Sequence, residues 1–428
     1  MNKIHDFRRA KNAKEAAMGL NTLRQKVNKI VEEAEVIDIH THIYSTDFGN
    51  LLLWGIDELL NYHYLQVELF RHRPDLSYQT FWRMKKSEQA ELIWNTLFLD
   101  HTPISEVCRG VITVLNKLGI DVTNRSLDAI RKYFANRNIE EHIDTVFQMA
   151  RVKYVVMTNN PFDDHEREVW MRGGNTDERF KASVRLDGIL NKYSENVSKL
   201  QSWGYDVEPS LNDKSKRELR RFLEDWIDRT NSIYLNVTFP PDFHYPEDSL
   251  RVRILDECVM PVLAERALPL AMMMGVVRGA NPHLRDGGDF MAKSDVRSVA
   301  RLVAAYPENK FLATFLSRED TYEACVAARK FKNLMPFGCW WFLNVPSLVT
   351  EMTKMRFELL GTSLIPQHSD ARVLDQLIYK WNHSKEIIAS VLAEKYADIV
   401  RAGWNVTEDE IKRDVANLFS NNFEQFIG

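Results

Sequence analysis

The chain has 428 residues, 45% of them hydrophobic and 27% charged, a globular composition that excludes disordered, collagen-like and coiled-coil proteins. Its net charge of −4 provides no basic field for nucleic acid. Four cysteines without a CxxC pair predict a reduced, cytoplasmic chain without disulfides. The first twenty residues lack the apolar core of a signal peptide, and no apolar run approaches the ~20 residues that span a bilayer. We therefore expect neither a nucleic-acid partner nor a membrane.

Short β-branched or apolar runs alternate with longer amphipathic stretches along most of the chain. The predicted strands are Val36–Tyr44, Val152–Thr158, Lys181–Asp187, Ser232–Phe239, Leu268–Gly275, Lys310–Leu316, Leu334–Trp341 and Gly361–Gln367. The predicted helices between the later strands are Asp213–Arg229, Ser249–Arg266, Ser294–Ala305, Arg318–Phe331 and Ser347–Leu360. Repeated strand–helix units indicate parallel strands with crossover helices. Eight such units predict an α/β fold, a (β/α)8 TIM-type barrel.

The interval between the first two predicted strands is too long for one crossover helix. It contains helical patterns at Ile56–Phe70, Ser87–Phe98 and Leu127–Ala150, which predict a large helical insertion at 45–151 that covers the active site. The other predicted divisions are an N-terminal helical segment at 1–35, the barrel itself at 36–44 and 152–385, and extra C-terminal helices at 386–428.

The first predicted strand contains Asp38-Ile39-His40-Thr41-His42. Alternate residues of a strand point to one side, so Asp38, His40 and His42 share a face. If the intervening isoleucines pack outward, this polar face lines the barrel interior. Two imidazoles at the end of one strand are nitrogen donors for a single divalent metal; a hydrogen-bonded or surface pair of histidines is the alternative.

Asp370 follows the last predicted strand in the sequence Ser369-Asp370-Ala371-Arg372. The first and eighth strands of a closed barrel are neighbours, and catalytic groups lie at the carboxyl ends of the strands. Asp370 is therefore predicted to be a third, anionic metal ligand beside His40 and His42. An N-cap aspartate is the alternative role, and His368 is a competing ligand.

Arginines also follow predicted strands. Arg185, Arg278 and Arg372, if they converge on one rim, form an anion site, because a guanidinium matches a carboxylate bidentately. Each one alone is more typical of a surface salt-bridge partner.

Two aromatic groups complete the set of candidates. In Tyr62-His63-Tyr64, His63 is a candidate acid or base and Tyr64 a hydroxyl donor, although packing aromatics on a helix would look the same. In the predicted seventh strand, Trp340 and Trp341 face opposite sides, so that one packs under the helices and the other closes the barrel mouth. No phosphate-binding glycine loop occurs, which argues against a nucleotide cofactor.

These residues, taken together, resemble the amidohydrolase superfamily, whose members are metal-dependent barrels. The ordered segments GIDELLNYHYL, SVRLD, MMGVVR, GCWWF and SDAR resemble its uronate isomerase family across essentially the whole chain. The resemblance implies aldose–ketose isomerisation of D-glucuronate to D-fructuronate and of D-galacturonate to D-tagaturonate. It implies one divalent metal, zinc or else manganese, held by His40, His42 and Asp370, and no organic cofactor.

The resemblance also implies roles for the other candidates. His63, Tyr64, Arg185, Arg278, Arg372 and the pair Trp340 and Trp341 match substrate-contacting and catalytic positions. The chain departs from the family pattern at Met273, where many members have a histidine, and at Tyr62, where the commoner members have aspartate. These departures indicate a divergent subgroup and bear on the identity and affinity of the metal.

Other classes of protein remain as alternatives. The first is a metal-dependent hydrolase of a small carboxylated amide, ester or lactone on the same barrel. The predicted fourth strand contains no lysine to bridge two metals, and the fifth and sixth contain no histidine, which disfavours it. The second is a sugar-acid binding protein without catalysis. We expect a small hexuronate as the ligand and, as for most soluble enzymes of this size, a homo-oligomer.

Overall fold

The structure is a computed structural model that describes residues 19–428; residues 1–18 of the predicted N-terminal segment lie outside the described residues. Within residues 19–428, a central sheet of seven parallel strands has the order β1-β2-β3-β4-β5-β8-β9. The strands are β1 Val36–Thr41, β2 Val152–Asn159, β3 Phe180–Arg185, β4 Leu235–Phe239, β5 Leu270–Met274, β8 Phe311–Phe315 and β9 Leu334–Pro336. Every residue of β1, β4, β5 and β8 is buried, as is typical of a parallel sheet.

The segment 364–371 lies between the two edges of this sheet. Beyond β9, Ile365 pairs with Phe337 in a parallel bridge. On the other side, the Asp370 N–H donates to the His40 carbonyl at 3.1 Å, and the His42 N–H donates to the Ala371 carbonyl at 2.7 Å. The sheet therefore curls into the predicted TIM-type barrel, and the fold class is confirmed. The prediction of a regular eighth strand at Gly361–Gln367 is wrong, because Pro366 has no N–H to extend the ladder.

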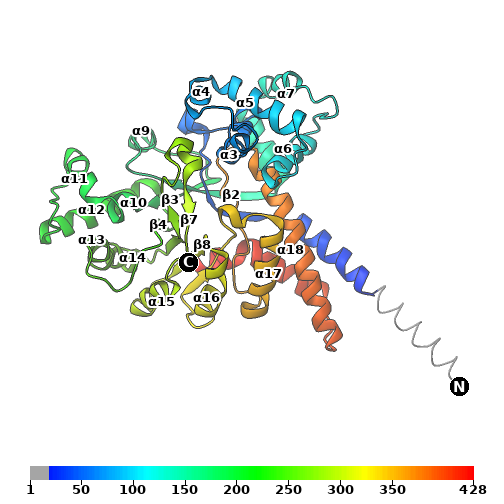
Figure 1. Cartoon of the computed structure of the whole chain (residues 1–428). Coiled ribbons are helices and arrows are strands. Elements are labelled where there is room, and N and C mark those ends of the chain that lie inside the picture. The colour runs from blue at the N-terminus through cyan, green and yellow to red at the C-terminus, as the bar shows by residue number, and fades with distance from the viewer. Residues whose placement is uncertain (1–18) are drawn as a thin grey trace.

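Helices follow the strands as predicted and surround the barrel (Figure 1). Those between β2 and segment 364–371 are α9 Asp164–Arg172, α10 Asp187–Leu190, α11 Tyr193–Ser202, α12 Asp213–Thr230, α13 Leu250–Ile254, η3 Leu255–Val259, α14 Met260–Arg266, α15 Val296–Ala305, α16 Arg318–Ala328, η5 Trp341–Leu343 and α17 Pro346–Leu360. In α12 the side chains of Leu219, Phe222, Leu223 and Trp226, which have helical spacing, form a buried apolar stripe. A small hairpin, β6 Val276–Val277 and β7 Phe290–Met291, encloses η4 Pro282–Gly288 after β5.

The predicted insertion between β1 and β2 is helical. It contains η1 Thr46–Leu51, α2 Ile56–Leu60, α3 His63–His72, α4 Tyr78–Arg83, α5 Lys86–Trp94, η2 Asn95–Asp100, α6 Glu106–Lys117, α7 Leu127–Ala135 and α8 Ile139–Ala150. Helices α3 to α7 gather at one end of the molecule (Figure 1). The chain ends with α18 Gln376–Arg401, α19 Glu408–Ala416, η6 Asn417–Asn421 and α20 Asn422–Ile427. The predicted boundary at 385/386 falls inside α18, and the division into domains stays a prediction.

The helix at residues 19–33 lies along α18. Arg24 donates to Ser390 Oγ at 3.2 Å, and Lys385 Nζ donates to the Ala34 carbonyl at 2.6 Å. In the described part of the chain, no helix combines the length and the apolar composition needed to cross a bilayer.

Candidate active site

His40, His42 and Asp370 lie together at one end of the barrel. His40 Nε2 is 3.7 Å and His42 Nε2 is 3.4 Å from Asp370 Oδ1, and one ligand atom from each residue lies within 4.8 Å of the other two. The pairing of β1 with β2 is irregular between Asp38 and Thr41, the stretch that contains His40 and directly precedes His42. Such irregularities are frequent next to active sites, where they redirect side chains.

This cluster fits a divalent metal. Burial, the largest cause, lowers the pKa of both His40 and His42, so that the imidazoles are neutral, the form that binds metal. Burial opposes ionisation of Asp370, but His42 and His40 hold its pKa well below its usual range. Asp370 Oδ1 is buried without a hydrogen bond among the described residues. Two neutral nitrogens and one anionic oxygen are ligands typical of zinc.

Neighbouring side chains fix the orientation of the cluster. His42 Nδ1 lies 2.8 Å from Thr158 Oγ1, which leaves Nε2 directed at Asp370. Asp370 itself has a φ of +50°, a conformation that aspartate adopts more readily than most residues.

Asp38 is not part of the group of possible metal ligands but holds the segment next to it. Its Oδ1 accepts from the Ser369 N–H at 3.0 Å and its Oδ2 from Trp381 Nε1 at 2.8 Å. Burial raises the pKa of Asp38 to about 6. Because Ser369 precedes Asp370, this contact fixes the segment that carries the acidic member of the cluster.

His368 packs against the cluster. Its ring lies 5.5 Å from the ring of His40 in an edge-on arrangement, and neither of its nitrogens has a hydrogen-bond partner among residues 19–428. Gly338 leaves room for the His368 ring. Its φ is +64°, and a Cβ at this position would lie 1.8 Å from His368 Nδ1. The compact group of possible ligands comprises His40, His42 and Asp370 without His368.

Tyr62 directly precedes α3, and His63 and Tyr64 are the first two residues of this helix. The His63 ring lies 4.4 Å from that of Tyr62 and 4.6 Å from that of Tyr64. Burial is the largest cause that lowers the pKa of His63, followed by the charge of Arg372, while Asp370 opposes the shift. Burial likewise raises the pKa of Tyr64 well above its usual value. His63 therefore lies within electrostatic range of the cluster, and both groups are neutral there.

The three predicted arginines have different surroundings. Arg185 pairs with Asp187 at 3.2 Å and Arg372 with Asp286 at 3.1 Å. Both contribute, after burial, to lowering the pKa of His42, which places them near the cluster. Arg278 pairs with Asp289 across the β6–β7 hairpin, and its side chain is 55% exposed. No contact in the described part of the chain joins Arg278 to the cluster.

The predicted strand does not extend to the two tryptophans, because β9 ends at Pro336, so strand alternation does not set their directions. Trp340 and Trp341 follow Gly338, and Trp341 begins η5 with a φ of +48°. Trp340 is 3% exposed and packs with the barrel interior. Trp341 lines a cavity of about 230 Å³ beside Tyr64.

Sequence reasoning missed two residues of α18, one beside this cavity and one beside Asp38. Lys380 lines the cavity, and Trp381 holds Asp38. One signal was present: Leu377, Lys380, Trp381 and Ser384 have the spacing of one buried helix face, and a lysine on such a face is unusual.

The parallel barrel, with His40 on β1, His42 directly after β1 and Asp370 after the last strand position, defines an amidohydrolase-like barrel with a candidate metal site. Neither the family models nor the curated proteins compared with the chain give a match. Among solved structures, a uronate isomerase from Bacillus halodurans C-125 is 54% identical, with a TM-score of 0.94 and coverage of 96% of this chain and 97% of that one. The chain therefore belongs to the uronate isomerase family.

More distant structures share the fold. A glucuronate isomerase from Caulobacter crescentus is 12% identical, with a TM-score of 0.77 and coverage of 95% of this chain and 94% of that one. A uronate isomerase from Thermotoga maritima is 14% identical, with a TM-score of 0.76 and coverage of 95% of this chain and 97% of that one.

Proposed function

We propose that the chain interconverts aldose and ketose forms of hexuronates, D-glucuronate with D-fructuronate and D-galacturonate with D-tagaturonate. The observation that carries the proposal is the 54% identity with the Bacillus halodurans uronate isomerase over 96% of the chain. The alternative, a hydrolase on the same barrel, has no comparable relative among the structures described above, and a binding protein without catalysis has none either.

We propose that His40, His42 and Asp370 hold one zinc ion, with manganese as the second candidate. When bound, such an ion supplies Lewis-acid polarisation and orientation of substrate oxygens. The neutral imidazoles and the ionised carboxylate described above support this assignment. A thioether suits a hard metal site poorly, so Met273 on β5 adds no ligand.

Asp370 is the proposed base for the carbon-bound proton. Its carboxylate removes the proton from C2, the electrons of that C–H bond form the C1=C2 double bond, and the carbonyl electron pair moves to O1. After proton exchange between the oxygens, the C2=O bond forms and the Asp370 carboxyl, whose proton exchanges with solvent, delivers a proton to C1. The sequence is redox-neutral overall and needs no co-reactant. The low pKa of Asp370 keeps the group ionised, and His63 is the rival base.

In this proposal, Tyr64 and His63 transfer protons to and from the substrate oxygens. The raised pKa of Tyr64 keeps its hydroxyl protonated as a donor, and the lowered pKa of His63 keeps its ring neutral, so that it is able both to give and to accept. A preorganised donor near a developing oxyanion is most effective in such a buried site.

Arg185 and Arg372 are the proposed anchors of the substrate carboxylate. The partner of Arg372, Asp286, has a side chain that is 76% exposed, so a substrate carboxylate replaces a weak surface ion pair. Arg278 stays a predicted third anchor. Of the two tryptophans, Trp341 is the proposed wall of the substrate site, and Trp340 supports it from the barrel interior. A homo-oligomer stays a prediction.

The test is direct conversion of both uronates by metal-analysed protein, with products identified by NMR. We expect fructuronate from glucuronate and tagaturonate from galacturonate. Solvent deuterium at C1 of product formed in deuterated water supports proton transfer, whereas its complete absence favours a hydride shift between C2 and C1. Hydrolysis of an ester or lactone without uronate conversion would establish the hydrolase instead.

A further inference from the structure

Lys380 is a buried cation in the second turn of α18. Only 7% of the residue is exposed, and burial lowers the pKa of its ammonium group. Taking a charged group out of water is costly unless the charge is paired, so buried lysines are rare. A buried lysine therefore calls for a partner.

Within residues 19–428, Lys380 Nζ has no carboxylate at ion-pair distance and no hydrogen bond. Its Nζ lies over the faces of two aromatic rings, 5.9 Å from the centre of the Tyr62 ring and 6.0 Å from that of Tyr379. Both distances are at the outer limit for attraction between a cation and a ring. These contacts compensate a buried ammonium only partly.

The cavity beside Lys380 has its acidic groups already satisfied. This space of about 230 Å³ is lined by Tyr64, Trp341 and Lys380 among others. Of its two acids, Glu106 contacts His383 at 2.5 Å and Arg109 at 2.9 Å, and Glu68 accepts from Ser105 at 2.6 Å. The arginines near the cluster also have carboxylate partners. Lys380 is thus the uncompensated cation of this cavity among the described residues.

The field of Lys380 reaches the proposed catalytic groups. Behind burial, which is the largest cause, its charge helps to lower the pKa of His63, and it helps to lower that of His368 to about 4. Asp370 in turn favours the charged form of Lys380. Lys380 therefore lines the cavity together with Tyr64 and lies within electrostatic range of His63 and of the metal-ligand cluster.

We infer that Lys380 contacts the substrate and stabilises the negative charge that develops on its C1 and C2 oxygens during isomerisation. The inference rests on the proposed function. As the C2 proton leaves, the C1 carbonyl electron pair moves onto oxygen, and the Lys380 ammonium compensates this charge while keeping its own proton. A fixed cation in a buried site needs no reorganisation to do so. The stabilisation grows toward the transition state, so it acts on kcat more than on affinity.

The test compares the Lys380→Met variant with the unaltered protein, using galacturonate and glucuronate as substrates. We expect kcat to fall by about 10²–10³-fold, the scale for loss of one oxyanion-stabilising group. The dissociation constant of a hexose-derived diacid, which has no aldehyde and cannot isomerise, should change far less. Metal content should be unchanged. If Lys380→Met fails to fold, Lys380→Gln replaces it.

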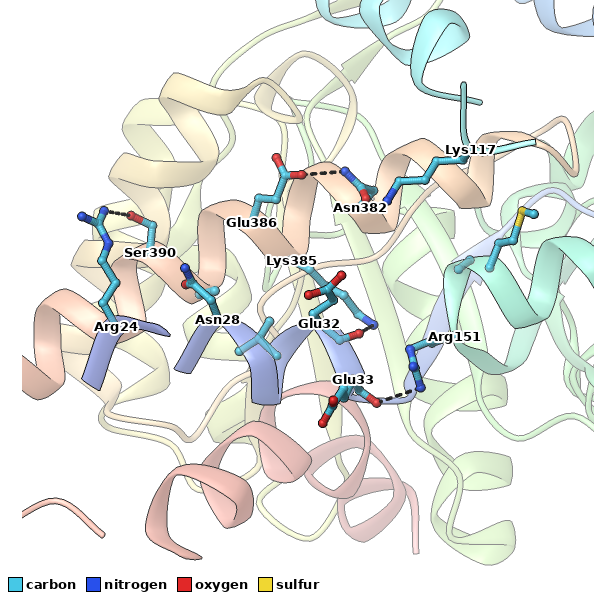
Figure 2. Close-up of a pocket in the computed structure, with 14 residues that line it drawn as sticks. Arg24, Asn28, Glu32, Glu33, Lys117, Arg151, Asn382, Lys385, Glu386 and Ser390 are labelled. Carbon is cyan, nitrogen blue, oxygen red and sulfur yellow. Dashed lines mark hydrogen bonds between the residues drawn. The ribbon is translucent and has the colours of Figure 1, made fainter. Parts of the chain in front are cut away.

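Lys385→Met is the matched control, because Lys385 is a second buried lysine on the same helix. It faces a different cavity, between α18 and residues 19–33 (Figure 2), and donates to the Ala34 carbonyl. Its loss should lower the melting temperature and leave kcat unchanged.

Two results would overturn the inference while the unaltered protein converts uronates. In the first, Lys380→Met keeps kcat within a few-fold. In the second, it weakens diacid binding and raises KM with kcat intact, which makes Lys380 a carboxylate anchor. Absence of uronate conversion by the unaltered, metal-loaded protein would instead refute the proposed function, and the inference with it.

Discussion

Asp375 and His142 form a buried hydrogen-bonded pair, although they lie 233 positions apart in the chain. Asp375 Oδ1 lies 2.7 Å from His142 Nε2, and both side chains are almost fully buried. The second oxygen of Asp375 accepts from the Gly55 N–H at 2.8 Å. Asp375 precedes α18, His142 lies in α8, and Gly55 precedes α2. One carboxylate thus joins the helical insertion to the barrel five residues after Asp370, and so fixes the segment that leads to His63 and Tyr64.

Asp375→Ala should destabilise the protein and lower its activity together. It leaves His142 Nε2 and the Gly55 N–H buried without partners, each at a cost of about 1–3 kcal/mol. Thermal unfolding and uronate turnover measure the two effects. Asp398→Ala, at an exposed position within α18, is the control and should change neither. A melting temperature equal to that of the unaltered protein would show that the pair contributes nothing.

His40→Ala combined with His42→Ala should lower bound divalent metal and activity while the barrel persists. The core of this barrel is large, so the metal is not its main source of stability. Metal analysis after gel filtration and circular dichroism measure the two properties. His244→Ala, with an exposed side chain, is the control. Full metal content in the double variant would refute the ligand assignment.

Arg185→Met and Arg372→Met should each impair conversion of uronates strongly. Removing one partner of a desolvated charge pair typically costs about 2–5 kcal/mol, which appears in kcat/KM. Arg318→Met is the control, because Arg318 is exposed and pairs with Glu351 on the neighbouring helix. An arginine whose variant handled both uronates normally would be a structural salt-bridge residue. Arg278→Met, assayed beside them, tests the predicted third anchor.

Glu166→Gln should remove a pH dependence of stability. Glu166 accepts from Tyr44 and from the Asn160 N–H, yet burial raises its pKa from 4.5 to about 7. Between these values the folded chain holds a proton that the unfolded chain has released, so stability falls as pH rises from 4.5 to 7 and levels off above 7.

The melting temperatures of the unaltered protein and of Glu166→Gln at pH 5 and pH 8 measure this effect. The decrease between the two values should be smaller in the variant, by up to ~1.4 kcal/mol for each unit of pKa shift. Glu168→Gln, exposed in the same helix, should leave the decrease as it is. Equal decreases in all three proteins would show that Glu166 is ionised throughout.

The sequence predicts the parts of this fold whose causes are local. The apolar spacing of α12 gives the helix within one residue, and the β-branched runs give the position of every strand in the seven-stranded sheet. His40, His42 and Asp370 were predictable as one cluster because barrel closure brings the first strand beside the last. Their neighbours were not, since Trp381 meets Asp38 and Ser369 meets Asp38 across more than 300 residues.

Two errors have identifiable physical causes. Pro366 has no N–H, so the last strand position consists of scattered hydrogen bonds rather than a ladder. Gly338, with its positive φ, ends the alternation of side chains just before the tryptophans. Lys380 could not be assigned from the sequence for another reason. Helical spacing indicates that its face of α18 is buried, but not that this face borders a cavity.

Asp370→Asn separates the two roles proposed for Asp370. Asparagine, like aspartate, tolerates a positive φ, so the backbone at this position should be retained and the charge alone is tested. If Asp370 were a metal ligand only, excess metal should restore much of the activity. If it is also the base, activity should stay about 10²–10⁴-fold lower with metal fully bound, the usual scale for loss of a general base.

We expect the second outcome, because asparagine cannot accept the C2 proton at neutral pH. The measurement is kcat at saturating metal, with metal content determined on the same samples. His63→Asn is the companion variant, since His63 is the rival base and is neutral in this site. Near-normal turnover of metal-saturated Asp370→Asn, together with its loss in His63→Asn, would assign the base to His63 and leave Asp370 as a ligand.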